Sequence, residues 1–327
     1  MRQGPPKAGM VWKLALGAGI FAWMAASGKL NLAEVARGFS HWPLMLAIAA
    51  LGYAQVAITT WRWNLLLRAQ AIRMPFRRAW GLTMIGMLFN VAIPGAVGGD
   101  LIKGYYITRA AADRKSHAAA SILMDRVVGM IGLLFLGAAM AAANLEVTTR
   151  SAATRSLGTL TAVGFLATMG GLYAALLAGG WLSEWRWIPG ILRNVLRALG
   201  EYRRHNRVVS AALALSILNQ TFSCAMYYLA LRATGVEGMP MGVFFLVVPL
   251  GLVTNAIPIS PGGVGVGQAA FFALFRLVAP VYAAPGTNAF TVYQVLYILV
   301  CLSGMYWYIS YKHASVETGA QAAEATS

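Results

Sequence analysis

The sequence has little charge, and this shortage limits what kind of protein it can be. Only 11% of its 327 residues are charged, whereas 59% are hydrophobic, and several apolar runs reach about 20 residues. Because about 20 consecutive apolar residues span the hydrocarbon core of a bilayer, the chain is predicted to be an all-α polytopic membrane protein. The same composition excludes a water-soluble globular domain.

The sequence is also poor in groups that bind metals or carry out chemistry. Its two cysteines, Cys224 and Cys301, lie inside apolar runs, so they are predicted to be packing residues and not a disulfide framework. Its four histidines and ten acidic residues form no metal spacing such as H-E-x-x-H, and no nucleotide-binding P-loop is present. We therefore predict no metal, no cofactor, no nucleic-acid partner and no enzyme activity.

Six apolar segments are long enough to cross a membrane. The first, Met10 to Ser27, follows basic residues as a signal peptide would, but the sequence after it is membrane-like too, so we interpret it as a spanning helix. The other predicted spans are Pro43 to Trp61, Val127 to Ala143, Leu157 to Gly180, Val208 to Leu231 and Asn288 to Tyr311. Residues 1–315 are predicted to form one membrane domain, and the small, polar residues 316–327 a disordered tail.

Two further apolar segments are broken by proline and paired glycine. Residues 90–100, NVAIPGAVGGD, and residues 254–268, TNAIPISPGGVGVGQ, share Ile-Pro-x-x-x-Gly-Gly, with the prolines 164 positions apart. Each break follows about 15 helical residues, or about 22 Å, which is too short for a hydrocarbon core of about 30 Å. The breaks therefore predict two re-entrant hairpins, and kinks in ordinary crossing helices are the alternative.

The basic residues favour one side of the membrane. If the six long segments cross and the broken ones do not, 19 Lys and Arg fall on the side of the two termini and six on the other. The positive-inside rule then places both termini in the cytoplasm. The hairpin at Pro94 would open inward and the hairpin at Pro258 outward. Like sequences in opposite orientation indicate an inverted repeat, with halves of roughly residues 43–143 and 208–311.

Residues beside the two breaks suggest an anionic ligand. New helices should begin at the glycine pairs, and helix N-termini present free N–H groups to phosphate-like groups. Lys103 lies one turn into the first such helix and could contact a phosphate, while Asp100 could cap that helix or pair with Lys103. The predicted binding residues at the breaks are Asn90, Pro94, Gly98, Gly99, Asp100, Lys103, Asn255, Pro258, Ser260, Pro261, Gly262, Gly263, Gly265 and Gln268.

Three charged residues outside the breaks complete the predicted binding site. Asp125 and Arg126 stand at the start of a predicted span, where a charged pair is costly unless it has partners. Structural pairing with Arg62, Lys103 or each other is as good an interpretation as contact with a ligand. Arg62 is a further candidate for ligand contact, although an interfacial anchor between two tryptophans is the simplest interpretation.

Residues 185–207, WRWIPGILRNVLRALGEYRRHNR, have apolar residues on one helical face and arginines on another. This pattern predicts an amphipathic helix lying on the anionic lipids of the inner leaflet. A positively charged cytoplasmic loop without a specific lipid partner is the alternative.

Taken together, these motifs resemble the lysylphosphatidylglycerol synthase transmembrane (flippase-like) family, in its short form without the soluble aminoacyl-transfer domain. The resemblance covers about residues 30–311. It rests on RWNLLL at Arg62, P-x-x-x-GGD-x-x-K from Pro94 to Lys103, DR at Asp125 and Arg126, and P-x-S-PGG-x-G-x-x-Q from Pro258 to Gln268. Lys103 stands where Arg is usual in the family, and Gln268 where Glu is usual.

The resemblance implies a lipid flippase of the bacterial cytoplasmic (inner) membrane, which moves a phospholipid or other lipid-linked headgroup between leaflets. Lysylphosphatidylglycerol is the substrate of the best-known members. Gln268 removes a negative charge that would suit such a cationic headgroup, and Lys103 keeps a cation without the bidentate geometry of Arg. An intramembrane lipid-modifying transferase, a pore and a non-transporting scaffold are the other candidate functions. The lipid, the driving force and a homo-oligomeric state stay open.

Overall fold

The computed structural model describes residues 19, 22–28, 31–92, 98–183, 187, 189–254 and 260–311. Within these ranges five segments are long and apolar enough to span a membrane, so the prediction of an all-α polytopic membrane protein is confirmed. Most of the predicted first span, the two proline breaks and the predicted tail lie outside the described residues. The long helices are α3 (Trp42–Ala69), α6 (Lys115–Ala143), α8 (Ala152–Leu182), α10 (Asn206–Ala233) and α13 (Ala283–Leu302).

Two of the long helices extend well beyond the predicted spans. α3 continues past Trp61 to Ala69, and α6 begins at Lys115, twelve residues before Val127. The predicted limits, Trp61 and Val127, lie beside Arg62 and Arg126, where the charged residues look like the ends of apolar runs. In the structure Arg62 and Asp125 pair with each other inside the protein, so the helices pass through them.

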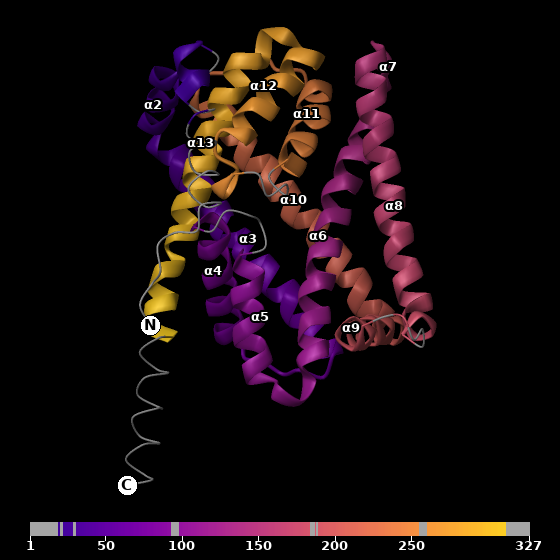
Figure 1. Cartoon of the computed structure of the whole chain (residues 1–327). Coiled ribbons are helices and arrows are strands. Elements are labelled where there is room, and N and C mark those ends of the chain that lie inside the picture. The colour runs from indigo at the N-terminus through magenta and orange to yellow at the C-terminus, as the bar shows by residue number, and fades with distance from the viewer. Residues whose placement is uncertain are drawn as a thin grey trace.

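Four shorter helices form two hairpins at opposite ends of the molecule. α4 and α5 pack together in the lower part of Figure 1, and α11 and α12 pack together in the upper part. The helices have 13 to 17 residues, about 20 to 26 Å, which is less than a hydrocarbon core of about 30 Å. Their bounds are α4 Phe76–Ala92, α5 Gly98–Ala110, α11 Met241–Thr254 and α12 Val266–Val278.

The remaining elements lie near the two ends. α9 (Gly190–Glu201) runs crosswise at the lower end (Figure 1), so the predicted amphipathic helix is present as a helix. Its apolar face packs on α6 and α8, and the Tyr202 hydroxyl after it donates to the Leu66 carbonyl oxygen at 3.0 Å. The other short elements are α2 Leu32–Ser40, η1 Ala112–Arg114, α7 Leu145–Thr149, η2 Tyr202–His205, η3 Pro261–Gly263 and η4 Pro280–Tyr282.

The helices of the two hairpins are enclosed by long helices from both parts of the chain. α3 packs along α10 at the centre of the molecule. α5 packs on α6 and α12 on α13, while α11 also packs on α6 and α4 on α13. As a result, Asn90 and Val91 of the first hairpin and residues 260–263 of the second lie around one space beside α3 and α10.

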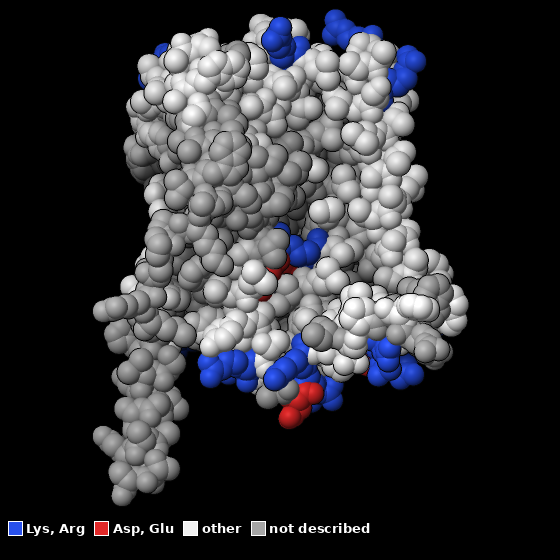
Figure 2. Space-filling view, viewed as in Figure 1, with Lys and Arg blue, Asp and Glu red and all other residues white. Residues whose placement is uncertain are grey.

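Charge is concentrated at the ends of the molecule and in one hollow between them. Figure 2 shows Lys and Arg at the upper and lower ends, and a smaller group of basic and acidic atoms inside a hollow about midway along this face. Three of the 19 basic residues assigned to the cytoplasmic side, Arg62, Lys103 and Arg126, line an internal cavity, so that assignment was wrong for them. Without them the sequence still carries 16 basic residues on that side against six on the other.

Candidate functional site

A cavity of about 370 Å³ lies between α3, α4, α5, α6, α10, α11, α13 and the turn η3. It receives residues from both motifs that the sequence analysis identified, although these motifs are 164 positions apart. Nine of the predicted binding residues line it: Arg62, Asn90, Asp100, Lys103, Asp125, Arg126, Ser260, Gly262 and Gly263. The remainder of the lining is apolar or neutral and polar.

One buried carboxylate holds two cations at the wall of this cavity. The Arg62 guanidinium donates from Nε to Asp125 Oδ1 at 2.8 Å and from Nη1 to Ser216 Oγ at 2.8 Å. Lys103 Nζ lies 3.9 Å from Asp125 Oδ2 and 3.7 Å from the centre of the Trp63 ring, a cation–π contact. Arg62 and Lys103 are each 5% exposed and Asp125 is 8% exposed. The interpretation of Arg62 as an interfacial anchor was therefore wrong.

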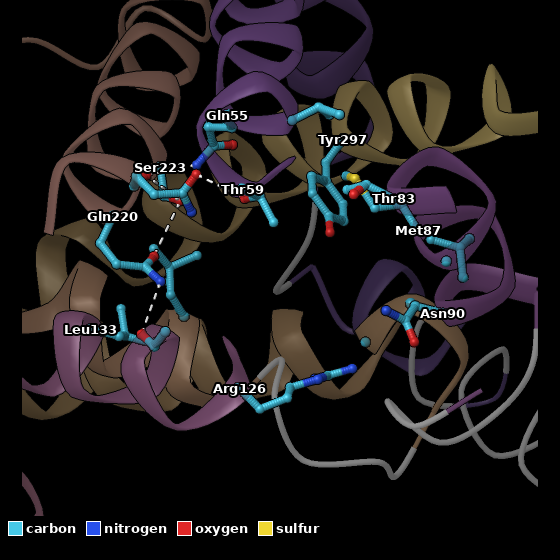
Figure 3. Close-up of a pocket in the computed structure, with 18 of the residues that line it drawn as sticks. Gln55, Thr59, Thr83, Met87, Asn90, Arg126, Leu133, Gln220, Ser223 and Tyr297 are labelled. Atoms are coloured by element: carbon cyan, nitrogen blue, oxygen red, sulfur yellow. Dashed lines mark hydrogen bonds between the residues drawn. The ribbon is translucent and has the colours of Figure 1, made fainter. Parts of the chain in front are cut away.

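A second ion pair faces the same space. Arg126 donates from Nε to Asp100 Oδ2, so Asp100 pairs with Arg126 and not with Lys103 as the sequence suggested. The Arg126 side chain is 41% exposed and points into the open cavity in Figure 3, toward the side where Asn90 lies. The cavity is therefore lined by three cations and two carboxylates, an excess of one positive charge.

The paired glycines of the first hairpin serve close packing. A Cβ on Gly99 would collide with the Gly86 carbonyl oxygen and lie 2.7 Å from the Asn90 side chain, so only glycine fits where α5 meets α4. The Gly99 N–H donates to Asn90 Oδ1 at 2.9 Å. This N–H was expected to be free for a ligand, and that expectation was wrong because Asn90 takes it. Gly98 and Gly99 are buried behind the cavity wall.

In the second hairpin, glycines in left-handed conformations precede α12. Gly262, Gly263 and Gly265 have φ values of 58°, 73° and 80°, which residues with a Cβ rarely adopt. Gln268 Oε1 accepts from the Gly265 N–H at 2.8 Å, and its Nε2 donates to Gln294 Oε1 at 2.6 Å. Gln268 and Gly265 therefore support the cavity wall from behind and do not line it.

Several lining residues were missed by the sequence analysis. They are neutral polar or phenolic side chains on three long helices: Gln55 and Thr59 on α3, Asn219, Gln220 and Ser223 on α10, and Tyr293, Gln294 and Tyr297 on α13. Each is a single polar residue in an apolar run, which is a weak signal. Their spacing of three or four positions, which puts them on one helical face, could have revealed them.

Four predicted binding residues cannot be placed in this way. Pro94, Asn255 and Pro258 lie outside the described residues, and for Pro261 only the backbone at the start of η3 is described.

The helices and the internal charged cavity define a polytopic membrane protein with a polar site inside its apolar body. The chain matches the family model described as lysylphosphatidylglycerol synthase TM region over residues 10–304, and it belongs to that family. The match covers most of the 327 residues. Searches among curated proteins and among solved structures found no similar protein.

Proposed function

We propose that this protein is a lipid flippase, which carries the anionic headgroup of a phospholipid or other lipid-linked molecule between the leaflets. The observation that carries the proposal is the excess of one positive charge in the cavity, where Arg62, Lys103 and Arg126 face only two carboxylates. Isolated charge inside a membrane protein is expensive, so such an excess is best explained by an anion that binds there. A phosphodiester carries one negative charge and would balance it.

The arrangement of helices supports transport through an inverted repeat. α3 to α6 have 28, 17, 13 and 29 residues, and α10 to α13 have 28, 14, 13 and 20, so a long–short–short–long order occurs twice. The two short pairs lie at opposite ends of the molecule (Figure 1). Transporters with inverted repeats bind their substrates near the midplane, between the halves. We infer that the short pairs are re-entrant hairpins that open to opposite sides.

The charge distribution supports an orientation in the bacterial cytoplasmic membrane. With 16 basic residues against six, the end that carries α5 and α9 is inferred to face the cytoplasm, with both termini. On this side α9 would rest on anionic lipids.

Transport without chemical change is favoured over a lipid-modifying reaction. A transferase in the cavity would need a free general base or nucleophile. Asp100 and Asp125, the two acids of the cavity wall, are each paired with a cation. Neither is therefore free to accept a proton from a substrate.

The test is transfer of a fluorescent phosphatidylglycerol across sealed proteoliposomes, followed by quenching from outside. Lys103→Gln should reduce the rate of transfer about tenfold or more, because a charge-assisted hydrogen bond to the phosphate would be lost. Lys103→Arg, which keeps the cation, should retain most of the rate. Chemically unchanged lipid should be recovered afterwards.

Equal transfer by Lys103→Gln and the unchanged protein, with both folded, would remove Lys103 from the mechanism. A transfer rate no higher than in protein-free vesicles would refute the flippase assignment, and conversion of the lipid into another species would favour the transferase.

A further inference from the structure

The cavity has a charged half and a neutral half. All the charged lining residues come from α3, α5 and α6, whereas the wall formed by Gln55 to Thr59 of α3, by α10, by α13 and by residues 260–263 contains only amides, hydroxyls and apolar groups. In Figure 3 the neutral residues Gln55, Thr59, Gln220 and Ser223 lie across the open space from Asn90, and the Tyr297 hydroxyl points into it. A ligand that fills the cavity therefore meets two different environments.

The neutral half keeps hydrogen-bonding capacity for a ligand. Gln55 donates to the Asn219 carbonyl oxygen at 2.8 Å and to Ser223 Oγ at 2.6 Å, which leaves its own Oε1 as an acceptor. Asn219 Oδ1 accepts from the Thr59 hydroxyl at 3.3 Å, which leaves its NH₂ group as a donor. Ser260 is 5% exposed, and its Oγ has no hydrogen-bond partner among the described residues. A buried hydroxyl without a partner is costly, so a bound ligand is a natural partner for it.

Among the residues that the structure describes, the cavity has no carboxylate left for a positively charged headgroup. Of the seven described acidic residues, Asp100 and Asp125 line the cavity, and each is paired with a cation. Residues 93–97 and 255–259, which fall between the described parts of the hairpins, contain no charged residue in the sequence. An ammonium group in the cavity would therefore meet three protein cations without a free counter-charge, which is unfavourable at low dielectric.

The free groups of the neutral half match hydroxyl groups. A hydroxyl both donates and accepts, and side-chain amides and serine offer both functions at short spacing. A volume of about 370 Å³ lies at the lower end of the range for small-molecule sites, which suits a compact headgroup.

We propose that the substrate headgroup is an uncharged polyol or sugar joined to the lipid through a single phosphodiester. The phosphate binds Lys103 and Arg126 in the charged half, and the hydroxyls bind Gln55, Asn219 and Ser260 in the neutral half. This inference rests on the proposed flippase function and names the class of lipid that it acts on.

The experiment compares three fluorescent lipids with the same acyl chains in proteoliposomes. Phosphatidylglycerol carries one phosphodiester and two hydroxyls, phosphatidylmethanol carries the phosphodiester alone, and phosphatidylethanolamine carries an ammonium group. Phosphatidylglycerol should cross at least about tenfold faster than the other two, since two or more neutral hydrogen bonds are gained.

Two variants test whether Ser260 contributes to the preference for phosphatidylglycerol over phosphatidylmethanol. Ser260→Ala should slow phosphatidylglycerol about threefold to tenfold, leave phosphatidylmethanol unchanged and keep the protein folded, because the hydroxyl has no partner among the described residues. Thr60→Val is the matched control: the Thr60 hydroxyl is also buried without a partner in the described part of the chain but does not line the cavity, so all rates should stay the same.

The outcomes separate the two proposals. If phosphatidylglycerol and phosphatidylmethanol cross equally fast, the headgroup assignment is wrong while the flippase function stands. Faster transfer of phosphatidylethanolamine would also overturn it and would indicate cation binding at Tyr293 and Tyr297. Protein-dependent uptake of soluble glycerophosphoglycerol would show that the site takes the free phosphodiester and not the lipid. If no lipid crosses, both proposals fail.

Discussion

At the scale of single residues, Asp125 is the centre of the site. Its two oxygens face Arg62 and Lys103, and all three side chains are nearly inaccessible to solvent. Burying charge in this way is costly unless the partners stay together, so the loss of one partner harms the protein more than the loss of both.

We predict that Asp125→Asn lowers the free energy of unfolding by about 3–5 kcal/mol, because it leaves two buried cations without a counter-charge. The double variant Arg62→Leu with Asp125→Leu should lose less than Asp125→Asn does. Thermal unfolding in detergent measures both. Asp113→Asn, at an exposed position of η1, is the control and should change little. If the double variant were less stable than Asp125→Asn, the ion pair of Arg62 and Asp125 would not be what stabilises this wall of the cavity.

The charged half of the site could be predicted from sequence, and the pairing of Asp125 with Arg62 or Lys103 was one of the interpretations that the sequence left open. A charge in an apolar run is conspicuous, so Arg62, Lys103 and Asp125 were all identified. The sequence could not choose among the possible partners, because Arg62 and Asp125 are 63 positions apart and only the fold brings them together. Gln55 and Asn219 escaped notice for the opposite reason, because a lone amide in an apolar helix resembles many others until the fold places it beside a cavity.

At the scale of elements, the hairpins depend on close backbone approach. In the lower hairpin α5 touches α4 at Gly99, with the Gly86 carbonyl oxygen where a side chain would begin. In the upper hairpin the Phe271 ring occupies the place of a side chain at Gly251. Glycine in these apolar helices is therefore a packing residue, and the sequence pattern alone indicated only a break.

Gly99→Ala should destabilise the protein by about 1–3 kcal/mol or more, because the added methyl group forces α4 and α5 apart. Gly170→Ala is the matched control, since nothing lies within 4 Å of a Cβ there, and it should be neutral or stabilising by up to about 1 kcal/mol. Thermal unfolding should therefore show a loss of stability for Gly99→Ala and no loss, or a gain, for Gly170→Ala. Equal destabilisation by both would mean that bulk in any helix is harmful and that this contact is not special.

At the scale of the whole molecule, the two hairpins lie at opposite ends although their motifs read alike. The basic residues of the sequence predict two hairpins that open to opposite sides of the membrane, although three of the counted cations line the cavity. The prediction does not depend on those three cations, because 16 basic residues against six remain without them.

Single cysteines test the orientation of the two hairpins in the membrane. In a background without Cys224 and Cys301, which are both buried, cysteines replace exposed Asp113 in η1, which follows α5, and exposed Val281 in η4, which follows α12. A maleimide that cannot cross the membrane should label position 281 in intact cells and position 113 only after the cells are opened. Labelling of both positions in intact cells would show that one hairpin crosses the membrane completely.

The hollow that exposes the charged atoms lies on the flank of the molecule, about midway between its two ends (Figure 2). In the proposed transport, a headgroup can enter from the side while its acyl tails stay among the other lipids. Moving tails through water or through the protein would disturb about 0.8 kcal/mol of hydrophobic free energy for every methylene group exposed. The flank opening avoids that cost, because the tails never change solvent. The protein then has to replace only the water around one phosphate and its attached group. A cavity of about 370 Å³ is large enough to hold this headgroup without the acyl tails.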